Sequence, residues 1–331
     1  MDTFARTSRR QFLYGAGCIA AGCSAPAPQQ TDQPTQTAVR PTTIGLIADP
    51  HHGLAPDADK RLGAFMAEVT DRKPDFIMQL GDFCHPARAV KSAASFLRTF
   101  EAFPGPRYHV VGNHDLDLAR SKREVLDGWG VKEAFYSFEH GGFHFAVLDC
   151  NFVKKADGRI TDWASGDRYE NRIHPDQLDW LAADLAGTKL PTVLVSHQGF
   201  GPKGEGGVVP NADDIRAVID AANARPGGSR VVLCLHGHNH LDRARVVSGV
   251  HFVELNSASY LWVGEKYGRM APYQESLFAF LTLDPRGTIR LSGRASAFSD
   301  PTPKERGYPD ADQVTARITD RELTFTPPQA G

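Results

Sequence analysis

The sequence predicts an α/β fold, and three features of its pattern indicate this class. In the first half of the chain, short apolar runs alternate with amphipathic stretches of helical period. After residue 240, short apolar runs dominate. Most of the apolar runs before residue 240 end in Asp, Asn or His, and sites in open α/β sheets assemble at such strand ends. We therefore expect parallel strands, right-handed crossover helices and a site at one sheet edge.

The first half of the chain supplies the clearest alternation. Apolar runs at 43–48, 75–80 and 107–111 predict three buried strands. Between them, apolar residues recur at helical spacing, which predicts helices over 57–71 and 87–103.

The second half begins with a hairpin. His140-Gly141-Gly142 separates two apolar runs, 134–138 and 143–148, in a typical hairpin pattern. Residues 151–174 are polar and without period, which indicates a long loop. The remaining expected elements are helices at 175–186 and 212–224 and strands at 192–195, 231–235, 242–248, 250–255, 278–283 and 288–292.

The composition is that of an ordinary globular protein. The chain has 331 residues, 41% hydrophobic and 23% charged, with a net charge of −2. This balance gives no sign of a nucleic-acid-binding surface. No apolar run reaches the roughly 18 residues that a membrane-spanning helix needs.

The N-terminus has the pattern of an export signal. Arg9-Arg10 followed by Phe12-Leu13 and the uncharged stretch 14–21 resembles a twin-arginine signal, so we expect residues 1–23 to direct export to the periplasm or cell envelope. The exit Ala20-Ala21-Gly22-Cys23 resembles a lipoprotein cleavage site. A lipid on Cys23 would place the protein at a membrane surface. The usual Leu of such sites is replaced by Ala20, so lipidation and simple export both stay open.

The rest of the chain divides by composition. Residues 24–42 are rich in Pro, Gln and Thr and predict a disordered linker. Residues 43–298 hold the predicted catalytic domain. Residues 299–331 are rich in Pro and charge and predict a C-terminal tail. The three cysteines beyond the signal lack disulfide spacing, so we expect a reduced fold with Cys84, Cys150 and Cys234 free.

Asp, Asn or His residues stand at the ends of five apolar runs. The glycines before three of these residues permit tight turns, which let side chains approach a shared ion. Carboxylate and imidazole suit borderline divalent ions such as Mn, Zn or Fe(II), and seven side chains are too many for one ion. The predicted metal ligands are Asp49, His51, Asp82, Asn113, His197, His238 and His240.

The ordered motifs Asp-x-His, Gly-Asp, Gly-Asn-His-Asp, His and Gly-His-x-His resemble those of the calcineurin-like metallophosphoesterase superfamily, over roughly residues 43–295. The resemblance implies an αββα sandwich of two central mixed β-sheets flanked by helices. It also implies hydrolysis of a small phosphate ester, mono- or diester, by a hydroxide that bridges two Mn, Fe or Zn ions. The rival interpretations are an inactive scaffold of this fold and a single-metal binding protein.

The resemblance also implies a role for each residue. His114 is expected to donate a proton to the leaving group or to stabilise the phosphoryl group, and Asp115 to hold a loop. For the metals, the implied ligands are Asp49, His51 and His240 for the first, Asn113, His197 and His238 for the second, and Asp82 for both.

One position departs from the family pattern. Three residues after the bridging Asp, relatives often carry an Asp that orients the catalytic His, or a Tyr that binds iron; here it is His85. We expect His85 to contact the first metal or to hydrogen-bond near His114. The loop 151–174 is expected either to overhang the metals, with Arg168 holding phosphate and Trp163 stacking on a ring, or to be a solvated loop.

Overall fold

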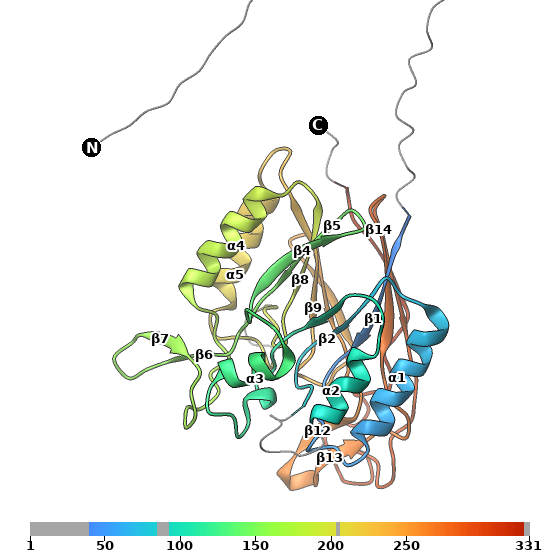
Figure 1. The fold of residues 1–331 in the computed structure, drawn as a ribbon. Helices are drawn as coiled ribbons and strands as arrows, with labels where there is room; N and C mark the ends of the chain where they lie inside the picture. Colours follow the sequence, from blue (N-terminus) through green and yellow to red (C-terminus); the bar gives the residue numbers. More distant parts are fainter. Residues whose placement is uncertain (1–39, 85–92, 203–205, 328–331) are drawn as a thin grey trace, which may run out of the picture. The chain divides into compact units, whose positions relative to one another are not determined.

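The computed structural model describes residues 40–84, 93–202 and 206–327. The predicted signal with Cys23, most of the linker, and His85 lie outside the described residues. Within them, two mixed six-stranded sheets pack face to face (Figure 1). This confirms the predicted αββα architecture.

The first sheet has the order β16-β15-β14-β1-β2-β3. Its first three strands in sequence are parallel, because a helical segment connects the first to the second and another connects the second to the third, as the sequence predicts. Its other half is antiparallel. The strands are β1 (Thr42–Ile47), β2 (Phe76–Gln79), β3 (Arg107–His109), β14 (Ala279–Asp284), β15 (Thr288–Gly293) and β16 (Arg321–Thr324).

The second sheet has the order β10-β11-β9-β8-β5-β4. Its central strands β5, β8, β9 and β11 are parallel, and antiparallel strands close both edges. The strands are β4 (Tyr136–His140), β5 (Phe143–Val147), β8 (Pro191–Val195), β9 (Arg230–His236), β10 (Arg243–Val247) and β11 (Val250–Glu254).

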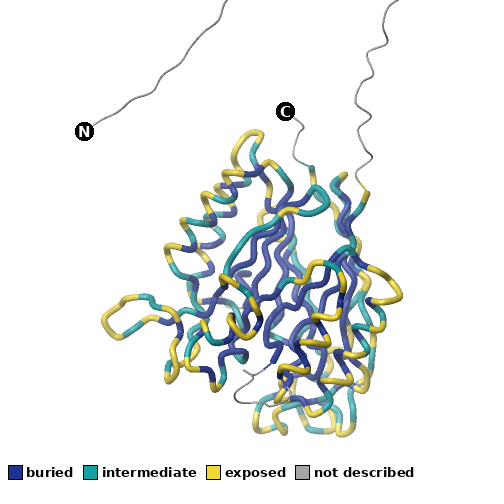
Figure 2. The backbone as a smooth tube through the Cα atoms, viewed as in Figure 1, coloured by how far each residue is buried: buried dark blue, intermediate teal, exposed yellow. Residues whose placement is uncertain are grey.

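Strand periodicity builds the four layers. Leu46 of β1 points between the sheets and joins the central core, whereas the next residue, Ile47, packs under the outer helices. In β8, Val193 and Val195 face the centre and Leu194 the other helix layer. The helices are α1 (Ala58–Arg72) and α2 (Ala93–Glu101) on the first sheet, and α4 (Pro175–Gly187) and α5 (Ala212–Asn223) on the second. Figure 2 shows the buried strands inside these exposed helix surfaces.

The predicted tail is part of the domain, which corrects the boundary at residue 298. Ala316 and Ile318 are buried in the central core, and β16 pairs with β15 through Leu323 and Ile289. The sequence pattern hid this strand because Leu323 is the only apolar residue among the four of β16, too few to show an alternation.

Several short elements were not predicted. The loop 151–174 contains a small hairpin, β6 (Phe152–Lys154) and β7 (Ile160–Asp162). A second hairpin, β12 (Tyr260–Gly264) and β13 (Arg269–Pro272), lies at the bottom of the view in Figure 1. The helix α3 (Lys122–Trp129) and two single-turn 3-10 helices, at His114–Leu116 and Glu265–Tyr267, complete the described elements.

Cys84, Cys150 and Cys234 are free and buried, as expected for a reduced fold. Across the described residues, no helix has the length and apolarity needed to cross a membrane.

Candidate metal centre

The seven predicted ligands lie in turns that follow five strands at one edge of the sandwich. Backbone hydrogen bonds connect these turns: Asp49 N–H donates to Gly81 O (3.1 Å), His51 N–H to Asp82 O (3.0 Å) and Gly237 N–H to His197 O (3.0 Å). The His238 N–H donates to Asp49 Oδ1 (3.1 Å) and so joins the turns of the first sheet to those of the second. The carboxyl ends of strands from both sheets therefore contribute to one connected structure.

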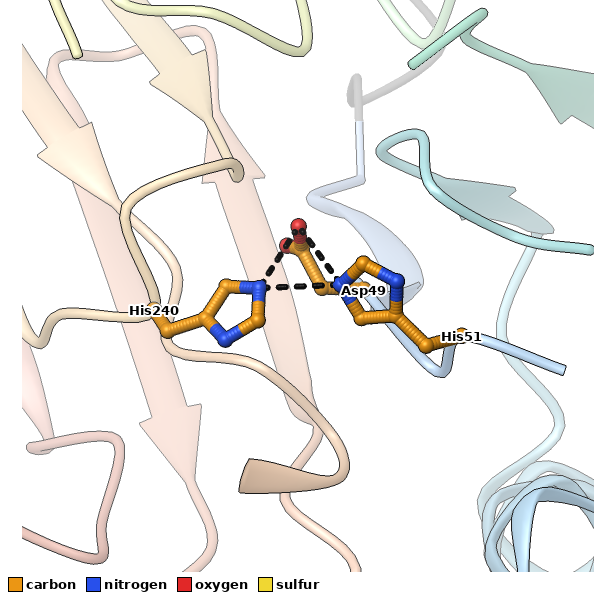
Figure 3. A group of neighbouring side chains, drawn as sticks. All are labelled: Asp49, His51 and His240. Carbon is orange, nitrogen blue, oxygen red and sulfur yellow. Dashed lines mark hydrogen bonds and ion pairs between the residues drawn. The ribbon is translucent and has the colours of Figure 1, made fainter. Parts of the chain in front are cut away.

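Asp49, His51 and His240 form the first group (Figure 3). Asp49 Oδ1 lies 3.4 Å from His240 Nε2 and 3.9 Å from His51 Nε2, and the two Nε2 atoms are 3.0 Å apart. All three side chains are at most 5% exposed. Three ligand atoms thus converge on one small buried space.

Asp82, His197 and His238 form the second group, whose ligand atoms lie within 4.8 Å of one another. Asp82 Oδ2 is 3.0 Å from His197 Nε2 and 3.8 Å from His51 Nε2 of the first group. The Asp82 carboxylate therefore lies between the groups, as a bridging ligand requires.

Asn113 is buried at the turn after β3. Its Oδ1 lies 3.4 Å from Gln198 Nε2, which also donates to Asn151 Oδ1 (2.9 Å) and Asn171 Oδ1 (3.1 Å). Sequence reasoning missed Gln198, although it directly follows the predicted ligand His197. Its amide fixes the orientation of the Asn113 side chain.

Two ligand histidines have their tautomer set by backbone carbonyls. Nδ1 of His197 lies 2.8 Å from Leu80 O, and Nδ1 of His240 lies 2.7 Å from Tyr260 O. A carbonyl only accepts, so Nδ1 carries the proton and the Nε2 lone pair faces the centre. In the first group the lone pair of His240 faces Nε2 of His51, an arrangement that a cation between them satisfies. The donor set fits two divalent ions.

The electrostatics of the second group agree with this fit. Burial lowers the pKa of His197, but the charges of Asp82 and Asp49 outweigh it and raise the pKa to about 9. Without a metal ion, a proton on His197 would thus offset part of the negative charge of the two carboxylates. Burial lowers the pKa of His238 to about 3 and that of His51 well below its usual range, so both are neutral as ligation requires.

The backbone of the centre is strained. Five of the seven predicted ligands have positive φ angles: Asp49 (51°), His51 (52°), Asp82 (49°), His238 (70°) and His240 (53°). Side chains rarely adopt this conformation, and each instance costs of order 1–3 kcal/mol. Such clustering of strain is typical of functional sites.

The glycines before three ligands are required by close approach. A Cβ on Gly112 would lie 2.2 Å from Asp82 Oδ1, and one on Gly237 would lie 2.6 Å from Asp49 Oδ2. Gly81 has a φ of +96°, and its Cβ would lie 2.4 Å from His197 Nδ1. Each glycine makes room for a ligand from another turn.

His114 has the carboxylate partner that the sequence left in doubt. Its Nδ1 lies 2.7 Å from Asp117 Oδ2, and the Tyr169 hydroxyl donates to the other oxygen of Asp117. Burial lowers the pKa of His114, but the hydrogen bond that its ring donates to Asp117 and the Asp82 charge outweigh it and raise the pKa to about 9. The carboxylate that orients His114 therefore belongs to Asp117, three residues further along the chain. In relatives it often belongs to the position that His85 occupies here.

Asp115 holds the loops, as predicted. Its carboxylate accepts from the backbone N–H groups of Phe83 (2.7 Å), Cys84 (2.9 Å) and Gly112 (2.8 Å). It thereby connects the turns after β2 and β3.

The loop 151–174 reaches the centre through Tyr169 and not through Trp163. Trp163 is 6% exposed and stacks against Tyr169, with ring centroids 6.3 Å apart. Its ring is thus occupied within the loop, and the expected stacking of Trp163 on a substrate ring is wrong. Arg168 is exposed.

A cavity of about 590 Å³ opens above the centre. Its wall includes His51, Asp82 and His238, the His114–Asp117 pair, and residues of the β12–β13 hairpin. This volume suits a small organic ligand.

The comparison with known proteins agrees with this geometry. A model of the calcineurin-like phosphoesterase family matches residues 42–247, more than half of the chain. The chain belongs to this family. As a calcineurin-like phosphoesterase it is a hydrolase of phosphate esters.

The proteins similar to this phosphoesterase include a diphosphatase, a probable phosphodiesterase and a dimetal phosphatase. A manganese-dependent ADP-ribose/CDP-alcohol diphosphatase of Arabidopsis thaliana is 24% identical over 55% of this chain and 70% of the relative. A probable cyclic nucleotide phosphodiesterase of Synechococcus is 27% identical over 50% of this chain and 59% of the relative. The fold of a dimetal phosphatase from Danio rerio matches with a TM-score of 0.57 at 15% identity, over 87% of this chain and 100% of that one.

The role of Gly112 leads to a prediction. Because a Cβ would collide with Asp82, we expect Gly112→Ala to lower metal content and activity by more than tenfold, in the range seen when support of metal ligands is lost, about 10–100-fold. Gly128→Ala is the matched control, since a Cβ there meets nothing within 4 Å. Metal analysis by mass spectrometry measures the effect, and equal metal content in both variants would contradict it.

Asp117 leads to a second prediction. If it orients His114 as a proton donor, Asp117→Asn should slow hydrolysis of a phenyl phosphate ester by roughly 100-fold, at the lower end of the range of general acid catalysis. The matching p-nitrophenyl ester should be less affected, because its leaving group needs no proton. The control is Asp127→Asn, at an exposed Asp that pairs with Arg123. An equal loss on both esters would indicate a structural role only.

Proposed function

We propose that this phosphoesterase hydrolyses small phosphodiesters or diphosphates, using two divalent ions, outside the cytoplasm. The observation that carries the metal assignment is the position of the Asp82 carboxylate, which lies 3.0 Å from His197 of its own ligand group and 3.8 Å from His51 of the other. The ligands we assign are Asp49, His51 and His240 to the first ion, Asn113, His197 and His238 to the second, and Asp82 to both.

The cavity favours a substrate with two organic substituents on phosphorus. Beyond the ligands, it includes both the His114–Asp117 pair and the β12–β13 hairpin. A monoester needs room for only one substituent beside the metals, whereas a diester needs two. The two curated relatives carry names of enzymes that cleave such linkages, a diphosphatase and a cyclic nucleotide phosphodiesterase.

The roles of the side chains follow from their charges. When bound, two divalent ions supply charge neutralisation at the phosphoryl oxygens and a lowered pKa for an attacking water. His114 lines the cavity with a proton to donate to the leaving oxygen, while Asp117 fixes its ring through Nδ1. The Tyr169 hydroxyl holds Asp117 in turn.

Manganese is the metal we propose, because the plant relative is named manganese-dependent and the mixed carboxylate, amide and imidazole ligands suit it. Chelation should abolish turnover of bis(p-nitrophenyl) phosphate, and Mn²⁺ should restore it with two ions bound per chain. Turnover of p-nitrophenyl phosphate should be slower.

The same assay separates the rival interpretations. One ion per chain would contradict the dinuclear site and favour a single-metal binding protein. Two bound ions without turnover of either ester would favour a scaffold. Faster turnover of the monoester would overturn the diester preference alone.

The proposed location rests on the N-terminal sequence. The Arg9-Arg10 pair, Phe12-Leu13 and the uncharged stretch up to Ala21 support export, and Cys23 supports a lipid anchor. We expect mass spectrometry of the mature protein to find a chain that begins at or near Cys23, and Arg9→Lys with Arg10→Lys to retain the full-length precursor in the cytoplasm. An unprocessed chain in the wild type would contradict export.

A further inference from the structure

Exposed apolar side chains gather at the mouth of the metal cavity. Large apolar residues are rarely exposed in the described part of the chain, yet Leu54 (39% exposed) and Trp262 (48%) both line the cavity that contains the metal ligands. A single exposed apolar residue needs no explanation, but two on the wall of the cavity that contains the metal ligands indicate a ligand with an apolar part.

The position of Trp262 is fixed by the strand that carries it. In β12, Leu261 and Val263 are buried in the central core, so alternation sends Tyr260 and Trp262 to the opposite, cavity face. Tyr260 is held by the metal centre itself: its ring stacks on His51 with centroids 5.1 Å apart, and its carbonyl oxygen accepts from His240. Trp262 therefore lies two residues along the strand from Tyr260, whose position is fixed by its contacts with His51 and His240.

The partner strand supports the indole ring. Met270 of β13 lies opposite Trp262 in the strand register and also lines the cavity. The Arg269 guanidinium lies 5.8 Å from the centre of the Trp262 ring and forms an ion pair with Glu265 (3.0 Å). A cation at this distance from an indole is attracted to its face, so Arg269 restrains the ring.

We propose that Trp262, with Leu54 and Met270, forms a subsite that stacks a nucleobase of the substrate. Such a ring suits this wall because an indole beside aliphatic side chains binds a planar aromatic group by stacking and burial. This inference rests on the proposed function, since the phosphate of the same ligand would lie at the metal centre. It adds a nucleoside phosphate as the substrate class.

The test compares two ligands that differ by the nucleoside. On the Mn²⁺-loaded full chain, isothermal titration calorimetry measures the Kd of AMP and of inorganic phosphate. We expect AMP to bind the wild type more tightly than phosphate does. Trp262→Ala should weaken AMP by about 5- to 100-fold, as for base stacking on aromatic residues, and leave the Kd of phosphate within about twofold.

Two further variants complete the design. Trp262→Phe keeps an aromatic ring and should retain most of the affinity for AMP. Val246→Ala removes an exposed apolar side chain that is not part of the cavity wall and should change neither Kd. Metal content and the unfolding temperature show that each variant is folded.

The possible failures are distinct. Equal Kd values of AMP and phosphate in the wild type, or an unchanged AMP affinity in Trp262→Ala, would overturn the subsite even if bis(p-nitrophenyl) phosphate is hydrolysed. Absence of that hydrolysis in the metal-loaded wild type would overturn the proposed function, while a stacking effect on AMP affinity would still support the subsite.

Discussion

The position of the Asp82 carboxylate is the constraint on which the centre depends. One oxygen accepts from His114 N–H at 2.7 Å and the other lies 3.0 Å from His197 Nε2. These contacts join the turns after β2, β3 and β8, which belong to both sheets. The carboxylate reaches this place only because the residue adopts a left-handed conformation and Gly112 has no side chain. The position of the Asp82 carboxylate therefore depends both on how the strands of the two sheets are aligned and on the strained backbone of one turn.

This arrangement buries negative charge, so the centre favours a bound cation. Asp49 and Asp82 are buried carboxylates, and both belong to the set of five ligands whose backbone is strained. Such charges are costly without a counter-charge. Without a metal ion, a proton on His197 would partly supply it, since the pKa of this residue is raised. Binding of metal ions replaces the proton and stabilises the folded state through the same contacts that define the site.

The sequence predicts the ligands and the fold better than their surroundings, for physical reasons. Asp49, Asp82 and His197 directly follow apolar strands, so local pattern alone brings them to one edge. The hydrogen bond between Tyr169 and Asp117 joins residues that are 52 positions apart in the sequence. Tyr169 lies in a polar loop without period. The β12–β13 hairpin lacks a short turn signal because a 3-10 helix connects its strands. Contacts that depend on loop conformation leave no periodic pattern in the sequence.

The histidines of the centre differ in function because different groups face their Nδ1 atoms. A backbone carbonyl faces this atom in His197 and His240, which holds a proton at Nδ1 and leaves Nε2 as the atom that faces the metal centre. A carboxylate faces it in His114, which stabilises the protonated ring. A metal ligand needs the lone pair, and a proton donor needs the proton. The second contact of each ring therefore separates ligation from acid catalysis among residues that the sequence alone presents as equivalent.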